Sequence, residues 1–123
     1  MKRIGLYILT LLTLTLLTNC NNDEKIEGLK ANEILVVTLE ILDDIKINEI
    51  ILTSTGGTDK IKGDQIDNRK KIKLKTPQSG EGTFKICIYT NTDTLCSQDS
   101  YIEGGYRPKL RLKNNKFETL EWY

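Results

Sequence analysis

The sequence predicts an all-β fold, a small antiparallel β-sandwich that begins at residue 33. Apolar runs that are either continuous or strictly alternating recur from there to the end of the chain, and Gly, Pro, Asn or Ser residues separate them at short intervals. The same part contains no long run with helical spacing. At 123 residues, 28% of them charged and 38% hydrophobic, the chain has the composition and the length of one folded domain.

Two strands are expected in the first half of this domain. Residues 34–42 are rich in β-branched and leucine side chains, and their continuous apolar start is typical of a strand buried on both faces, although a short helix would fit the same run. Residues 46–53 form a second predicted strand, ended by the turn residues 54–57. Residues 58–68 are then expected to be a solvated loop.

Two further strands show strict alternation. Residues 71–75 place Ile72 and Leu74 on one face and lysines on the other, and residues 83–90 point three apolar side chains to one face, Phe84, Ile86 and Ile88. One side of each strand is therefore predicted to pack in the core.

The C-terminus is predicted to be a hairpin around Asn114-Asn115, because Asn tolerates the left-handed angles of a two-residue primed turn. This register pairs Leu112 with Phe117 and Arg111 with Glu118, as cross-strand pairs prefer. It places two sets of side chains on opposite faces: Leu110, Leu112 and Phe117 in the core, and Lys109, Arg111, Leu120 and Trp122 outside.

The first 19 residues have the features of a secretory signal peptide. Lys2 and Arg3 precede an uncharged, leucine-rich run at residues 4–17, and a polar stretch follows at once. A membrane-spanning helix needs about 20 apolar residues, so this run is too short to be one.

The end of that run, Leu17-Thr18-Asn19-Cys20, resembles the lipobox of bacterial lipoproteins. The resemblance implies that the Cys20 thiol receives a diacylglycerol, that a signal peptidase cuts before it, and that the new amino group is acylated, for example with palmitate. Two or more acyl chains make membrane attachment stable. The resemblance therefore implies a lipoprotein anchored by Cys20 in the cell envelope, in the outer membrane on its periplasmic or surface face.

Residues 20–32 are then expected to be the lipidated cysteine and a polar tether that stays solvated. Asn22, Asp23 and Glu24 are similar to the surface-export signal of some lipoproteins, and a plain spacer is the alternative. The formal net charge of +1 includes Lys2 and Arg3, so the processed chain is slightly acidic. Nucleic acid is excluded as a partner, because it would demand a strong positive excess.

The segment from Gly80 to Ile86 resembles the strand entry of immunoglobulin-like domains, in which a small or acidic residue, a glycine and an aromatic residue alternate. Phe84 stands where those domains have a tyrosine, and Ile86 stands at their intersheet cysteine. The resemblance implies an immunoglobulin-like variant of the sandwich.

With Cys20 assigned to lipid, Cys87 and Cys96 are the pair that remains in a chain bound for an oxidising compartment. A two-residue turn at Asn91-Thr92 would place them opposite each other on neighbouring strands, close enough for a disulfide. Two buried thiols or a redox pair are the alternatives.

No catalytic or cofactor chemistry is predicted. The chain has no histidine, which removes the usual general base, the common nucleophile arrangements and most zinc and copper sites. Asp43-Asp44 are expected to end a strand rather than to form a catalytic carboxylate pair. Asp59, Asp64 and Asp67 raise the possibility of a calcium site in the 58–68 loop, but the regular ligand spacing of calcium loops is missing. No enzyme, cofactor or metal is expected.

Two surface features remain as candidate partner sites. The lysine and arginine stripes at residues 71–75 and 109–113 would form one basic face if they fell on the same sheet, and solvated strand faces are the alternative. Lys109, Arg111, Trp122 and Tyr106 could form a binding patch for a protein or a glycan. The competing interpretation is that Trp122 packs under the tether or against the first strand.

Taken together, the sequence favours a lipid-anchored, non-catalytic binding or adaptor module. An immunity or inhibitor lipoprotein, which would need a tight and charge-complementary interface, is one alternative. A structural accessory of an envelope complex, which would show a large apolar patch, is the other alternative.

Overall fold

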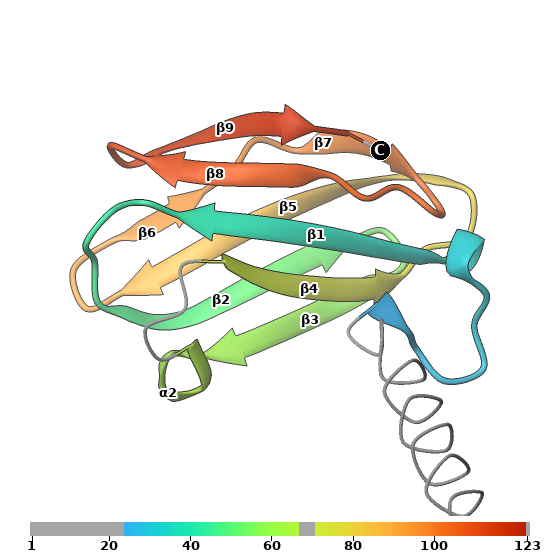
Figure 1. Ribbon diagram of the computed structural model, residues 1–123, viewed down its shortest axis with the longest axis horizontal. Helices are drawn as coiled ribbons and strands as arrows, with labels where there is room; N and C mark the ends of the chain where they lie inside the picture. The colour runs from blue at the N-terminus through green and yellow to red at the C-terminus, as the bar shows by residue number, and fades with distance from the viewer. Residues whose placement is uncertain (1–23, 67–70, 123) are drawn as a thin grey trace, which may run out of the picture.

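The chain folds into two β-sheets that pack face to face, as the computed structural model in Figure 1 shows for the described residues, 24–66 and 71–122. The all-β sandwich expected from the sequence is therefore confirmed. The strands are β1 (Ile34–Ile41), β2 (Ile47–Ser54), β3 (Gly57–Lys62), β4 (Lys71–Pro77), β5 (Glu81–Thr90), β6 (Thr94–Cys96), β7 (Ser100–Glu103), β8 (Lys109–Lys113) and β9 (Lys116–Glu121).

The first sheet has the strand order β4-β1-β8-β9, and the second has the order β3-β2-β5-β6 with β7 also paired to β5. Strands β1 and β8 run parallel, and the other pairs are antiparallel. Immunoglobulin constant domains order their strands ABED and CFG. The chain thus shares their sandwich architecture but has a different strand order.

The core lies between the sheets and is made by the alternating positions that the sequence indicated. Phe84, Ile86 and Ile88 of β5 are at most 1% exposed, and Ile72 and Leu74 of β4 are buried in the same cluster. Because buried aliphatic and aromatic side chains each contribute about 1.5–3 kcal/mol, this cluster is the main source of stability.

The prediction that residues 58–68 form a loop is wrong for residues 58–66, the part of this range that the structure describes. Residues 57–62 form β3, which makes a tight hairpin with β2, and the four-residue helix α2 (Gly63–Ile66) follows. Only Ile61 in β3 packs against the core cluster, so the strand lacks the apolar alternation that marks the others. The hairpin turn needs Gly56, because a Cβ atom there would lie 2.0 Å from the carbonyl oxygen of Pro77.

Polar groups that are buried or half-buried connect the two sheets at the edge where β3 meets β4. The Asp59 carboxylate accepts a hydrogen bond from the backbone N–H of Lys75 at 2.9 Å. The Gln78 side chain, only 2% exposed, accepts one from the backbone N–H of Gly56 at 3.0 Å and donates one to the carbonyl of Gly80. Asp59 therefore acts as a structural acceptor, because burial demands that such backbone donors be satisfied.

The C-terminal hairpin has the predicted turn and inner register. Leu112 pairs with Phe117 and Arg111 with Glu118, and the turn residues Asn114 and Asn115 have φ angles of 52° and 60°. A bulge then shifts the register, so that Lys109 pairs with Glu121. Because one extra residue reverses the facing of everything beyond it, the prediction that Trp122 shares a face with Lys109 and Arg111 is wrong.

The N-terminal segment, here residues 24–33, folds back along the outside of the first sheet, whereas the sequence predicted a solvated tether. It ends in the short 3-10 helix η2 (Ala31–Glu33), where the Glu33 carboxylate accepts a hydrogen bond from the Lys30 backbone N–H. Ile34 and Val36 are each 1% exposed but do not belong to the core cluster, because their side chains point to the outer face. The segment, Ile34 and Arg107 together line a cavity of about 480 Å³.

Candidate functional site

The four residues of the predicted binding patch do not form one surface. Lys109 and Arg111 lie on the outer face of the first sheet, and each is engaged by a carboxylate, Lys109 by Glu121 at 3.1 Å and Arg111 by Glu40 at 3.2 Å. The Arg111–Glu40 pair joins neighbouring positions of the parallel strands β8 and β1. Arg111 is thus one half of a cross-strand ion pair.

The two aromatic residues of the predicted patch lie on the other side of that sheet. Tyr106 packs against the core cluster. Trp122 contacts Phe84 edge to face, with ring centroids 6.4 Å apart and planes at 83°. Trp122 is 37% exposed, so it closes the core at the open edge of the sandwich. It packs on β5, rather than on the first strand or under the tether as the sequence interpretation had it.

The predicted disulfide between Cys87 and Cys96 is confirmed. Cys87 and Cys96 form a disulfide between β5 and β6, with Cα atoms 4.1 Å apart at directly opposed positions. Its sulfurs lie on the outer face of the second sheet, because Cys87 alternates with the core residues Ile86 and Ile88. Cys20, with Asn22 and Asp23, lies outside the described residues.

The two basic stripes do fall on one sheet. Lys71, Lys73 and Lys75 of β4 and Lys109, Arg111 and Lys113 of β8 flank the outer face of β1. Glu40 lies between the stripes, opposite both Lys71 and Arg111. The face is therefore basic, and the carboxylate of Glu40 lies between its two basic stripes.

Glu24, the first described residue, is bound on this face. Its carboxylate lies 3.0 Å from the Lys73 ammonium and 3.8 Å from the Arg107 guanidinium. The hydrogen bond from Lys73, with the positive charges of Lys73 and Arg107, holds the pKa of Glu24 below its ordinary value, although partial burial works in the opposite direction.

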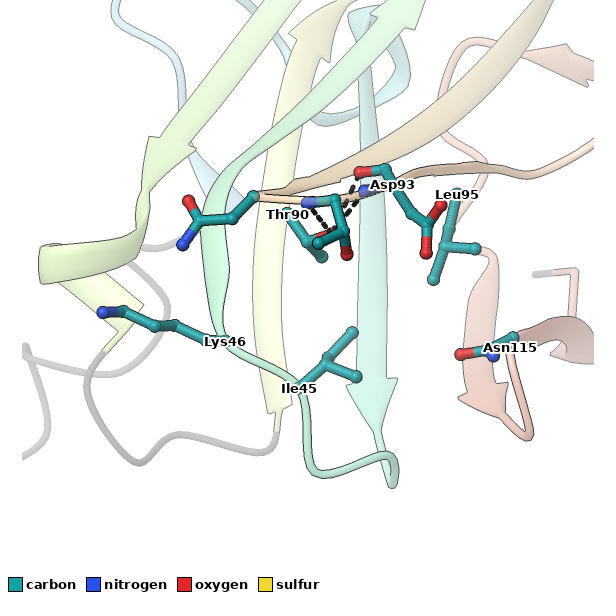
Figure 2. A pocket seen from close by; sticks show the side chains of 8 residues that line it. Ile45, Lys46, Thr90, Asp93, Leu95 and Asn115 are labelled. Atoms are coloured by element: carbon teal, nitrogen blue, oxygen red, sulfur yellow. Dashed lines mark hydrogen bonds between the residues drawn. The ribbon is translucent and has the colours of Figure 1, made fainter.

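A hollow that the sequence did not indicate lies at the end of the sandwich where β1, β5 and β8 finish (Figure 2). Three connections surround it: the β1–β2 loop, the β5–β6 turn and the β8–β9 turn. We call it the loop-end hollow; it is lined by Ile45, Lys46, Thr90, Asn91, Thr92, Asp93, Leu95 and Asn115.

Hydrogen bonds fix each of the three connections. Asp43 of the β1–β2 loop accepts the backbone N–H groups of Asn114 and Asn115 at 2.7 and 2.8 Å. Within the β5–β6 turn, the backbone N–H of Thr90 donates to the carbonyl of Asp93 at 2.9 Å, and the Thr90 hydroxyl accepts from the Asp93 N–H at 3.0 Å. The walls of the hollow are therefore held in place by the chain's own hydrogen bonds.

The loop-end hollow combines an apolar floor with a polar rim. Ile45 and Leu95 pack against the core cluster from below it. Figure 2 shows Ile45 pointing into the space between Lys46 on one side and Asn115 on the other, under the turn that carries Thr90 and Asp93. Neither Lys46 nor Asp93 forms an ion pair with another residue of the described ranges, and both are exposed.

The volume of the hollow, about 280 Å³, lies at the lower limit of pockets that hold small molecules, which is roughly 300 Å³. It suits one side chain of a protein partner better than a cofactor. Sequence reasoning missed the hollow because its residues come from three turns far apart in the chain. Taken alone, the sequence of each turn shows only polar residues that connect two strands, and this pattern does not indicate a pocket.

No cluster of three or more His, Cys, Asp or Glu side chains suited to a metal occurs within residues 24–66 and 71–122. In the same ranges, no helix has the length and hydropathy that crossing a membrane requires. No protein-family model matches the sequence, and no curated protein resembles it significantly.

Proposed function

We propose that the chain is a lipid-anchored, non-catalytic binding module of the cell envelope, which presents the loop-end hollow to a protein partner. The anchor is Cys20 of the lipobox-like Leu17-Thr18-Asn19-Cys20. The observation that carries the proposal is the position of the hollow relative to the N-terminal segment.

The N-terminal segment joins β1 at Ile34, and the β1–β2 loop leaves β1 after Ile41, at the opposite end of the sandwich (Figure 1). Eight residues of extended chain separate the two by about 25 Å, at roughly 3.3 Å per residue. A partner can therefore reach the hollow while the N-terminus stays attached to a membrane.

A protein partner fits this surface for two reasons. Interfaces take much of their binding energy from a few side chains inserted into well-packed pockets and surrounded by polar groups. The apolar floor of Ile45 and Leu95, with the amides of Asn91 and Asn115 on its rim, provides such a pocket. The opposite charges of Lys46 and Asp93 on the rim would orient the partner.

The anchor is tested by the Cys20→Ser variant. We expect this variant to accumulate as an unprocessed precursor, larger than the processed wild-type protein, that takes up no labelled palmitate. Normal processing and labelling of the variant would contradict the anchor.

The partner site is tested by replacing Thr92, an exposed residue of the hollow, with a photo-crosslinking amino acid in the full-length chain. We expect a discrete cross-linked protein from position 92 and none from Lys60, an exposed residue on the second sheet. Lys46→Glu should reduce the yield about tenfold, and the matched Lys60→Glu should leave it unchanged. Equal yields from positions 92 and 60 would contradict the site.

A further inference from the structure

The two outer faces of the sandwich differ in charge. On the second sheet, the outward positions of β2, β3, β5 and β7 carry equal numbers of cations and carboxylates, namely Lys60, Lys62 and Lys85 against Glu49, Glu81 and Glu103. Lys60 and Glu49 also pair at 3.7 Å. This face is electrically balanced.

On the first sheet, the outer face carries more cations than carboxylates. The basic side chains of its strands are Lys71, Lys73, Lys75, Lys109, Arg111, Lys113 and Lys116, and the acidic ones are Glu40, Glu118 and Glu121. Glu24 of the N-terminal segment adds a fourth carboxylate beside Lys73. Lys71 and Lys113 are exposed and form no ion pair with any described residue. Their ammonium groups are therefore available to an anionic surface.

The N-terminal segment reaches the molecule on this same face. Glu24 is fixed between Lys73 of β4 and Arg107, which precedes β8, and the Lys75 ammonium donates to the backbone carbonyl of Lys25. Four residues lead from Cys20 to Glu24, and they can span at most about 14 Å. Acyl chains on Cys20 would therefore hold the membrane close to the first sheet and far from the second.

We propose that the outer face of the first sheet docks on an anionic lipid surface. The proposal rests on the lipid anchor proposed above, because the anchor holds the first sheet near the membrane and the basic side chains of that sheet attract anionic headgroups. Attraction between basic residues and anionic headgroups acts within about one Debye length, roughly 8 Å at physiological salt. The tether of at most about 14 Å is short enough for the lysines to come within this range, and the loop-end hollow remains open at the end of the sandwich.

The test uses the full-length lipidated protein on vesicles of phosphatidylcholine alone and of phosphatidylcholine mixed with phosphatidylglycerol. A water-soluble amine-acylating reagent labels the lysines, and peptide mass spectrometry gives the rate at each one. We expect Lys71, Lys109 and Lys113 to react about threefold more slowly on the anionic vesicles, and this difference to disappear at high salt.

Lys60, Lys62 and Lys85 of the second sheet are the internal controls and should react equally on both vesicles. The double variant Lys71→Gln, Lys113→Gln should abolish the protection of Lys109. The matched double variant Lys60→Gln, Lys62→Gln removes the same charge from the other sheet and should preserve it.

Two failures are distinguishable by flotation. Protein that floats with both vesicles but shows the same rate at every lysine overturns the docking proposal and leaves the anchor intact. Protein that floats with neither vesicle contradicts the anchor, and the docking proposal falls with it.

Discussion

Asp43 Oδ1 lies 2.7 Å from the backbone nitrogen of Asn114, at the tip of a hairpin 71 residues further along the chain. The second oxygen of the same carboxylate accepts the N–H of Asn115 at 2.8 Å. The β1–β2 loop and the β8–β9 turn are thereby joined, and together they form one side of the loop-end hollow. Asp43, which was expected only to end a strand, therefore also fixes the β8–β9 turn, and we call this pair of hydrogen bonds the Asp43 clamp.

We expect Asp43→Asn to reduce the free energy of unfolding by about 1–2 kcal/mol, because an amide offers one acceptor where the carboxylate offers two charge-assisted ones. Urea unfolding measures the change. Asp44→Asn is the matched control, because Asp44 is exposed and has no hydrogen bond with a described residue. Equal effects of the two substitutions would refute the clamp.

The turn itself leads to a second expectation. Asn115 has a φ of 60°, a left-handed conformation that costs residues other than Gly and Asn about 1–2 kcal/mol. Asn115→Ala should therefore destabilise the protein by about 1 kcal/mol, and Asn115→Gly should be close to neutral. Thermal unfolding of the two variants gives the comparison, and a larger loss with glycine than with alanine would contradict the turn assignment.

Apolar runs and alternation predicted most of the fold correctly, because both patterns report which sides of a strand are buried. Residues 34–42, 46–53, 71–75 and 83–90 all lie in or overlap observed strands. Strand β3 was missed because its position depends on the Gly56 turn and on Asp59, which bonds the backbone of β4. Those contacts join segments that are separate in sequence, and periodicity within one segment does not reveal them.

The candidate sites were harder to predict for the same reason. Lys109 and Arg111 were correctly placed on an outer face, but their carboxylate partners come from β9 and β1. One bulged residue was sufficient to move Trp122 from that face to the edge of the core. The pairing of Cys87 with Cys96 was predictable because it depends only on the short turn between them.

The disulfide should contribute measurably to stability. It joins two residues that are nine positions apart in the sequence. For a loop of this length, the loss of chain entropy in the unfolded state predicts a stabilisation of about 2–3 kcal/mol. We expect the Cys87→Ala, Cys96→Ala variant and the reduced wild-type protein to lose about the same free energy of unfolding in urea. A loss only in the variant would assign the effect to side-chain packing rather than to the cross-link.

Trp122 is the only tryptophan of the chain, so its fluorescence reports on the edge of the core. Phe84→Leu should shift its emission to longer wavelength, because the ring loses its edge-to-face partner and gains contact with water. Trp122→Ala should cost about 1 kcal/mol. Leu120→Ala, at a 42% exposed position two residues earlier in β9, should cost less than about 0.5 kcal/mol. An emission spectrum unaffected by Phe84→Leu would contradict the contact.

The attachment of the N-terminal segment should depend on pH through Glu24. Its pKa in the folded protein lies below the ordinary value of 4.5, because the Lys73 hydrogen bond and the nearby cations favour the carboxylate. The stabilising contribution is therefore complete above pH 4.5 and is lost as the pH falls through the lowered pKa.

Hydrogen exchange at the backbone amide of Leu29, which donates to the carbonyl of Ile26, measures this attachment as a protection factor. We expect protection to fall below pH 4.5 in the wild-type protein. Glu24→Gln should lower protection at neutral pH and remove its acid dependence. Glu27→Gln, at an exposed position without an ion pair to the described residues, should retain both. Identical profiles for the two variants would show that another group attaches the segment, because Glu24 is the one carboxylate of the described residues that pairs with both Lys73 and Arg107.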